Sequence, residues 1–432
     1  MSSKLSNRFS RALEITKMMA KLGLQEVRSG SLQSRIEQAK ILTESLSQLK
    51  GAAMKAGQLL SLDLEDYFPP EALKILAQLQ NSIADTPDIN IKKTLLSAFG
   101  EEKFQKLSEI QSKPFAAASM GQVYRATLTA DDVKHAVAFK VLYPGVAESV
   151  SSDVALLQKA VWAFCKMTGR QMDLDPVFAE IESVLKSEVD FVQEKNSTVA
   201  FQKLFSQHTW KYLEIKTPHV FESYSTHGIL CTSFEDGLTL KDWIEKKPAK
   251  DKKEKVALSL LELYTLEFFK WGLVQTDPNP SNFIIRGLDK LEVIALDFGA
   301  SKTYSYEFRK AYTGLLKTIR SGSDDDIIKR SIDFGLIDAR ESKETLELFI
   351  QLLKHGIKPF SQNKKFQFSD DTFLKENGLL ARTLLQKLKF SAPPHQLLFL
   401  HRKLGGVYAI LRKLEVEIEV SDFWNSIENN KI

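Results

Sequence analysis

Three oxygen-bearing side chains in the second half of the sequence have the order and spacing of a site for phosphoryl transfer. Asp277 stands five residues before Asn282, and Asp297 begins an Asp-Phe-Gly sequence fifteen residues further on. The Asp277 carboxylate can accept or orient the proton of a nucleophile, whereas Asn282 and Asp297 offer the hard oxygen atoms that Mg²⁺ prefers. An ordinary turn rich in Asp and Asn is the alternative interpretation, and the combination of all three residues at this spacing argues against it.

A lysine inside an apolar strand pattern is the second chemical feature. In Val137-Ala138-Phe139-Lys140 the ammonium group follows a hydrophobic run, where a buried cation needs an anionic partner. A helical segment further along carries Glu188, Asp190 and Glu194. We expect Glu194 to pair with Lys140 and to hold it against the α- and β-phosphates of a nucleotide. Alternatively, the three acids only form a solvated helix face.

The elements that position these residues fall into three predicted parts. Residues 1–110 have a helical pattern, and residues 111–235 combine short strands with further helices around a polar turn at Ala130-Asp131-Asp132. Residues 236–432 are mostly helical, with two strand-like segments beside Asn282 and Asp297. The predicted fold class is therefore α+β: a bilobal protein-kinase-like fold with an N-terminal helical extension, a small lobe with inserted helices and a helical large lobe.

The glycine-rich phosphate loop of ordinary kinases is missing. Where Gly-x-Gly-x-x-Gly would stand, the sequence has Ala116-Ala117-Ala118-Ser119-Met120-Gly121, and neither a Walker sequence nor a dinucleotide fingerprint occurs elsewhere. Because alanine restricts the backbone more than glycine does, we expect this loop to approach phosphates less freely and to change the nucleotide preference. The simpler interpretation is that the alanines only fill a strand.

Composition excludes several classes of protein. A chain of 432 residues with 43% hydrophobic and 26% charged residues is typical of a globular protein with two or three subdomains. Its two cysteines leave no disulfide framework and no thiolate zinc site, which favours a reducing intracellular compartment, either the cytoplasm or an organelle matrix. The net charge of +4 does not indicate nucleic-acid binding, and no run approaches the roughly 18 apolar residues of a membrane-spanning helix.

The beginning of the sequence is basic and amphipathic. Residues 1–50 contain nine Lys or Arg and four Glu, a net charge of +5. Apolar residues recur there at steps of three or four, at Leu5, Phe9, Ala12, Ile15, Met19 and Leu22. Such a helix can lie on an anionic membrane surface as a peripheral contact, or it can pack its apolar stripe against the rest of the protein.

Several motifs together resemble the UbiB-like atypical kinase family, the coenzyme-Q-associated kinase-like ATPases. The segment from Ala116 to Gln122 is similar to its alanine-rich loop, Met54-Lys55-Ala56-Gly57-Gln58 to its Lys-x-Gly-Gln motif, and Glu188-Val189-Asp190 to its Glu-x-Asp motif. Gln275-Thr276-Asp277-Pro278-Asn279 and His401-Arg402-Lys403-Leu404 are closest to the mitochondrial coenzyme-Q branch. The resemblance covers about residues 40–410.

The resemblance implies ATP and Mg²⁺ as cofactors. It implies nucleotide contacts from the alanine-rich loop, at Ala116, Ala117, Ala118, Ser119 and Gln122, together with Lys140 and Glu194. It also implies that the Lys-x-Gly-Gln helix lies over the active site, with Lys55 and Gln58 facing Glu188 and Asp190 in a regulatory contact. A helix in that position would occupy the place of a peptide substrate.

The expected function is an ATPase or phosphoryl-transfer activity that supports ubiquinone biosynthesis. Expected partners are a nucleotide, an isoprenoid or quinone-like lipid and other coenzyme-Q-synthesis proteins. No Arg precedes Asp277 and no Ala-Pro-Glu follows Asp297, so a peptide substrate is disfavoured. Two alternatives stay open: a kinase acting on a lipid, small molecule or protein, and a nucleotide-regulated scaffold for lipid-modifying enzymes.

Overall fold

The computed structural model describes residues 89–118, 120–167, 175–287, 290–361, 364–391 and 395–428. Contacts divide the chain into two compact units. The first contains the described residues up to Gln193 together with Phe221–Ser233, and the second contains Glu194–Val220 and the chain from Phe234 onward. Ser119, Lys55 and Gln58 lie outside the described residues, as does the predicted amphipathic helix. The division at residues 110 and 235 stays a prediction.

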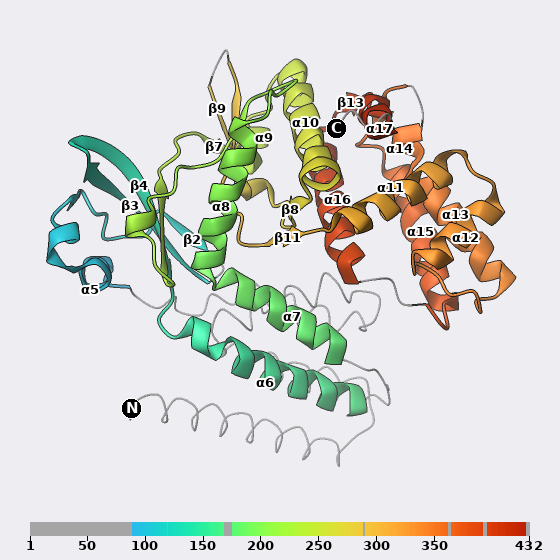
Figure 1. The fold of residues 1–432 in the computed structure, drawn as a ribbon, viewed down its shortest axis with the longest axis horizontal. Coiled ribbons are helices and arrows are strands. Elements are labelled where there is room, and N and C mark those ends of the chain that lie inside the picture. Colours follow the sequence, from blue (N-terminus) through green and yellow to red (C-terminus); the bar gives the residue numbers. More distant parts are fainter. Residues whose placement is uncertain are drawn as a thin grey trace. The chain divides into compact units, whose positions relative to one another are not determined.

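The first unit is built around a five-stranded antiparallel sheet (Figure 1). Its order is β1 (Leu107–Ser108), β3 (Gly121–Ala130), β4 (Val133–Leu142) and β6 (Ile229–Ser233), and β2 (Ala116–Ala118) also pairs with β3. The predicted polar turn joins β3 to β4. Asp131 and Asp132 both have positive φ values, 50° and 60°, the conformation of a tight two-residue hairpin turn.

Buried and partly buried residues alternate along β4, so one face of the strand lies in the core and the other carries Lys140. Val137, Phe139 and Val141 are buried, whereas Lys140 lies between them in sequence and is only partly buried. Phe99 of α5 (Ile91–Phe104) packs against Phe139 with ring centroids 6.2 Å apart. The same unit contains α6 (Val146–Met167), α7 (Asp175–Glu188), the 3₁₀ turn η1 (Glu222–Tyr224) and the first residues of α8 (Phe191–Ser206).

The second unit is mainly helical around one large apolar core. Its largest sheet has the order β5 (Ile215–Lys216), β10 (Glu292–Ala295), β9 (Phe283–Arg286) and β7 (Leu238–Thr239). Two smaller ladders pair β8 (Leu273–Gln275) with β11 (Ser301–Thr303), and β12 (Phe366–Gln367) with β13 (Glu417–Ile418). The helices, seen in Figure 1, are α9 (Leu240–Glu245), α10 (Lys250–Thr265), α11 (Tyr306–Ser321), α12 (Asp324–Asp333), α13 (Lys343–Gly356), α14 (Lys358–Ser361), α15 (Asp371–Lys387), α16 (His395–Leu414) and α17 (Ser421–Glu428).

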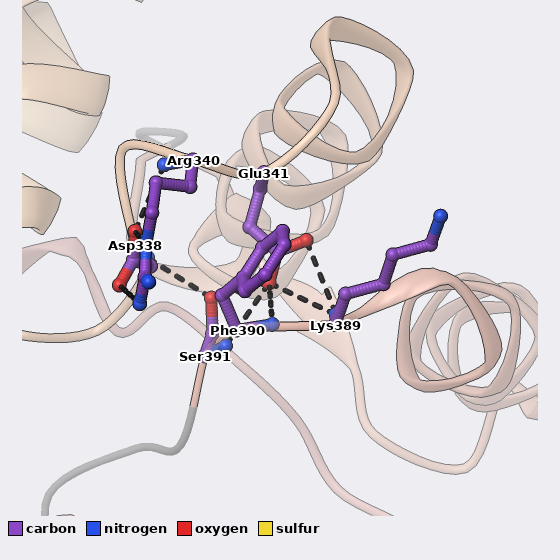
Figure 2. Close-up of polar contacts among 6 residues, drawn as sticks. All are labelled: Asp338, Arg340, Glu341, Lys389, Phe390 and Ser391. Carbon is purple, nitrogen blue, oxygen red and sulfur yellow. Dashed lines mark hydrogen bonds and ion pairs between the residues drawn. The ribbon is translucent and has the colours of Figure 1, made fainter.

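A buried carboxylate ties the loop before α13 to the segment after α15. Glu341 is 6% exposed, and its Oε1 accepts hydrogen bonds from the backbone N–H groups of Lys389, Phe390 and Ser391 at 3.0, 2.8 and 3.0 Å (Figure 2). The Ser391 hydroxyl donates to the same oxygen at 2.8 Å and accepts from the Asp338 N–H at 2.9 Å. Burial raises the pKa of Glu341, but these hydrogen bonds lower it by more, and its net pKa lies below the usual value.

Glu341→Gln should lower the free energy of unfolding by about 1–3 kcal/mol at neutral pH, because it removes a charged acceptor from four donors. Since folding lowers this pKa, the contribution is present above the unfolded pKa and is lost as pH falls through the folded pKa. Urea unfolding at pH 7 and down to about pH 4 and below measures the difference. Glu347→Gln, at a side chain 59% exposed, is the control. Equal losses for both variants, or a loss independent of pH, would contradict this role.

Candidate active site

The β9–β10 hairpin brings Asn282 and Asp297 to the same place. Asn282 directly precedes β9, Asp297 follows β10, and the antiparallel register pairs Phe283 with Ala295 at the open end of the hairpin. The Leu296 N–H donates to the Asn282 carbonyl at 2.9 Å and extends the pairing by one step. Strand pairing therefore places Asn282 opposite Leu296, the residue before Asp297, so that two residues fifteen positions apart lie at the same end of the hairpin.

Asp277 is fastened to Asn282 by the side chain of that asparagine. The Asn282 Nδ2 donates to the Asp277 carbonyl at 3.2 Å and to its Oδ2 at 3.3 Å. Between them, Asn279 Oδ1 accepts from the Ser281 N–H at 3.0 Å and starts the 3₁₀ turn η3 (Pro280–Asn282), with proline at its first position. The structure thus brings together the loop residues that the sequence spacing predicted as neighbours.

The Asp-Phe-Gly segment is anchored by its phenylalanine. Phe298 is 1% exposed and stacks on Phe201 of α8 with ring centroids 4.5 Å apart. Asp297 Oδ1 accepts from the Gly299 N–H at 3.0 Å, which fixes the carboxylate toward its own turn. A Cβ placed on Gly299 would lie 3.4 Å from Glu194 Oε2, so the buried Glu194 carboxylate lies against this turn. The second unit therefore holds Asp277, Asn282, Asp297 and Glu194.

The first unit holds the predicted lysine and the alanine-rich loop. Lys140 pairs with Val123 of β3 and Leu230 of β6, and its Nζ lies 5.1 Å from the centre of the Phe191 ring. Because Lys140 and Glu194 belong to different units, their ion pair stays a prediction. Asp190 caps α8, accepting the Gln193 N–H at 2.9 Å.

The three alanines of the alanine-rich loop form strand β2, which pairs with the start of β3. Ala118 pairs with Gly121, and Ala117 pairs with Gln122. Gly121 cannot carry a side chain without a shift, since its Cβ would lie 2.2 Å from the Val141 carbonyl oxygen. Ala116 and Ala117 are exposed, as phosphate contacts through this hairpin would require. Gln122 is buried and accepts the Tyr124 hydroxyl at 2.6 Å, so its amide oxygen takes part in the sheet, and its nucleotide contact stays a prediction.

Sequence reasoning missed the role of α16 beneath the Asp277 loop. Arg402 Nη2 lies 3.8 Å from Asp277 Oδ1. One turn later, Gly406 packs so closely that a Cβ there would lie 2.0 Å from Pro278 Cγ. The sequence signal was the His401-Arg402-Lys403-Leu404 stretch, which by itself carries no spacing typical of a site.

The donor set fits magnesium that arrives with a nucleotide. Among the described residues, no group of three or more His, Cys, Asp or Glu side chains could hold a metal ion. Magnesium, however, commonly takes only one or two carboxylates and completes its shell with water and substrate phosphates. Asn282 turns its amide nitrogen toward Asp277, so its amide oxygen is not used in that contact. One carboxylate and one amide oxygen at a hairpin end fit a partial shell of this kind.

The two units together are those of a kinase-like protein. One is strand-rich and carries a lysine in its sheet, and the other is helical and carries the Asp, Asn and Asp-Phe-Gly residues. The family model of the ABC1 atypical kinase-like domain matches residues 78–331. The chain therefore belongs to the ABC1 atypical kinase-like family, and the resemblance to UbiB-like atypical kinases is confirmed.

Curated relatives cover most of this chain. It is 28% identical over 394 residues to "Atypical kinase coq-8, mitochondrial" of Caenorhabditis elegans, a match that spans 90% of this chain and 51% of that protein. The identity to "Atypical kinase COQ8, mitochondrial" of Saccharomyces cerevisiae is 28%, over 90% of this chain and 76% of the relative. The identity to "Probable serine/threonine-protein kinase abkA" of Dictyostelium discoideum is 29%, over 90% and 70%. The chain thus spans about half the length of the nematode relative.

A solved structure shows the same fold. The Mycobacterium tuberculosis protein Rv3197, determined in complex with erythromycin, matches with a TM-score of 0.61 over 88% of this chain and 93% of that chain. At 22% identity the match is evidence of the fold alone, and it confirms the predicted kinase-like α+β class.

Two neighbouring glycines allow a direct test of the contact under the Asp277 loop. Gly406→Ala should reduce ATP turnover at least about tenfold, because the added methyl group displaces Pro278 and with it the adjacent Asp277. Gly405→Ala is the matched control, since a Cβ at Gly405 meets nothing within 4 Å. Steady-state turnover of both variants measures the effect, and equal activities would show that α16 does not support the loop.

Proposed function

We propose that this protein is an atypical kinase-like ATPase that binds a magnesium nucleotide and acts in support of ubiquinone biosynthesis. One observation carries the proposal: Asp277 is hydrogen-bonded to Asn282 at the end of the same hairpin that presents Asp297. These are the residue types, in the chain order, that phosphoryl transfer from a magnesium nucleotide requires.

Each side chain has a separate part in the proposed reaction. Asp277 orients the attacking nucleophile and accepts its proton. Asn282 and Asp297 would hold Mg²⁺, which when bound neutralises charge on the phosphates. Asn282 also restrains Asp277 through its amide nitrogen, so one residue serves both the metal and the carboxylate.

The first unit contributes the other half of the proposed site. Lys140 would bind the α- and β-phosphates with Glu194 as its counter-ion, and the exposed alanines of the β2–β3 hairpin would cover the phosphates. Phe191, at the start of α8, lies beside Lys140. Glu194, about one turn later in α8, lies beside Gly299. This common helix supports the pairing.

Water is the favoured acceptor of the phosphoryl group. No Arg precedes Asp277 and no Ala-Pro-Glu follows Asp297, and these are parts of the machinery with which ordinary protein kinases order a peptide site. The Lys-x-Gly-Gln segment with Lys55 and Gln58, facing Glu188 and Asp190, is proposed as the regulatory cover in its place. Ubiquinone as the pathway follows from the family resemblance and from the COQ8 relatives.

Location at an organelle membrane is part of the proposal. The nematode and yeast relatives carry the word mitochondrial in their names. None of the described helices has the length and apolar character needed to cross a bilayer. We propose peripheral contact through the basic segment of residues 1–50, which brings the protein to isoprenoid or quinone-like lipids and to other coenzyme-Q-synthesis proteins.

Asp297→Asn should abolish magnesium-dependent ATP binding or turnover, because it removes the charged ligand of the proposed metal. Asp251→Asn, at an exposed position in the first turn of α10, is the matched control and should behave like wild type. Phosphate release and nucleotide binding with and without Mg²⁺ measure both variants. Wild-type turnover by Asp297→Asn would refute the assignment.

A kinase acting on a separate acceptor is the second candidate, favoured by the name of the Dictyostelium relative, a probable serine/threonine-protein kinase. Incubation of the full chain with γ-labelled ATP, anionic liposomes, quinone-precursor mimics and a general protein substrate separates the two. The ATPase proposal predicts labelled free phosphate and no labelled acceptor. Label that appears in an acceptor, and that Asp277→Ala abolishes, would replace hydrolysis by transfer.

A further inference from the structure

The second unit buries a lysine–glutamate ion pair next to the Asp277 loop. Lys403 of α16 and Glu267 have side chains 2% and 1% exposed, and Lys403 Nζ lies 3.0 Å from Glu267 Oε2. Burial raises the pKa of Glu267, and the Lys403 ammonium together with the Gln275 N–H opposes that rise. Such a pair is expensive to desolvate, and apolar residues of similar volume often give equal or higher stability. Stability alone therefore does not account for it.

The pair leads directly to the backbone of Asp277. Lys403 Nζ also donates to Gln275 Oε1 at 3.1 Å, and the Gln275 Nε2 donates to the Asp277 carbonyl at 2.6 Å. The Gln275 N–H points back to Glu267 Oε1 at 3.4 Å. Because the Asn282 amide donates to the same Asp277 carbonyl, this backbone oxygen is held by two side chains. The Gln275 side chain thus connects the ion pair to the Asp277 loop.

An unusual helix end aims Glu267 at this position. Glu267 lies in the π-helical turn η2 (Leu266–Trp271), which continues α10 and ends at Gly272 with φ 70°. Arg309 of α11 donates to the carbonyls of Phe269 and Lys270 at 2.9 and 3.1 Å and so satisfies backbone groups at the end of the helix. π-Helical turns are frequent at functional sites, and here the turn carries a buried acid.

We propose that Lys403 is a positioning residue for phosphoryl transfer, paired with Glu267 and acting on Asp277 through Gln275. The inference rests on the proposed function. It explains how the Asp277 loop is held although no arginine precedes Asp277. The cation comes instead from α16, and its counter-ion is a buried glutamate within the chain. In this proposal the buried pair supplies the cation that holds the Asp277 loop, so that no phosphorylated segment is needed for it.

Two sets of variants separate positioning from simple stability. Lys403→Met leaves Glu267 buried without its cation and should unfold more easily than wild type. The double variant Lys403→Met with Glu267→Met removes both charges and should regain stability, but kcat should stay at least about tenfold below wild type. Gln275→Met keeps the ion pair but removes both side-chain hydrogen bonds of Gln275, to Lys403 and to Asp277, so it should show the same loss in kcat. The KM for ATP should change less than about twofold in both, since neither touches the nucleotide.

Hydrogen exchange of residues 276–282, measured on the same proteins without nucleotide, gives a readout independent of activity. Both the double variant and Gln275→Met should exchange these amides at least about tenfold faster than wild type, with the core of the second unit unchanged. Wild-type exchange in this segment, or a wild-type kcat in either variant, would overturn the inference. Absence of ATP turnover by the wild-type protein, combined with faster exchange in the variants, would instead refute the proposed function and keep the positioning contact.

Discussion

The pairing of β9 with β10 is the constraint on which the candidate site depends. With Phe283 opposite Ala295, the hairpin places Asn282 and Asp297 together at its open end, and Asn282 then holds Asp277. A slip of one residue would turn the side chains of one strand to the other face and change which residue lies opposite Asn282. Phe298 keeps the following turn in place because its ring is buried against Phe201. Backbone pairing and the packing of Phe298 thus determine where the polar side chains of Asn282 and Asp297 lie.

Buried carboxylates fix two different loops of the second unit by different means. Glu341 accepts hydrogen bonds from three backbone N–H groups and a hydroxyl. Glu267 has a buried cation as partner and passes the restraint on through Gln275. The first arrangement joins the loop before α13 to the segment after α15, which are remote in sequence. The second lies under the proposed catalytic loop, where orientation has more consequence than stability.

Local sequence patterns predict many of the strands and turns of this structure, whereas they do not predict contacts between residues far apart in the sequence. Alternating apolar residues and turn-forming residues predict β4, β9 and β10, as the structure shows. The motif spacing predicts that Asp277, Asn282 and Asp297 meet; the structure joins Asp277 to Asn282 and places Asp297 just after β10. Gly405 and Gly406 look alike in the sequence, but only Gly406 touches Pro278. The Lys403–Glu267 pair has no local signal, because one lysine and one glutamate far apart resemble any surface charges until the fold buries them. For the same reason the partnership of Lys140 with Glu194 stays a prediction.

A crystal structure of the full chain with Mg²⁺ and a non-hydrolysable ATP analogue tests the central claim most directly. The account predicts one magnesium site with Asn282 and Asp297 among its ligands, the γ-phosphate facing Asp277, and Lys140 on the α- and β-phosphates with Glu194 beside it. A nucleotide bound elsewhere, or bound at Asn282 and Asp297 with Lys140 remote from its phosphates, would contradict it.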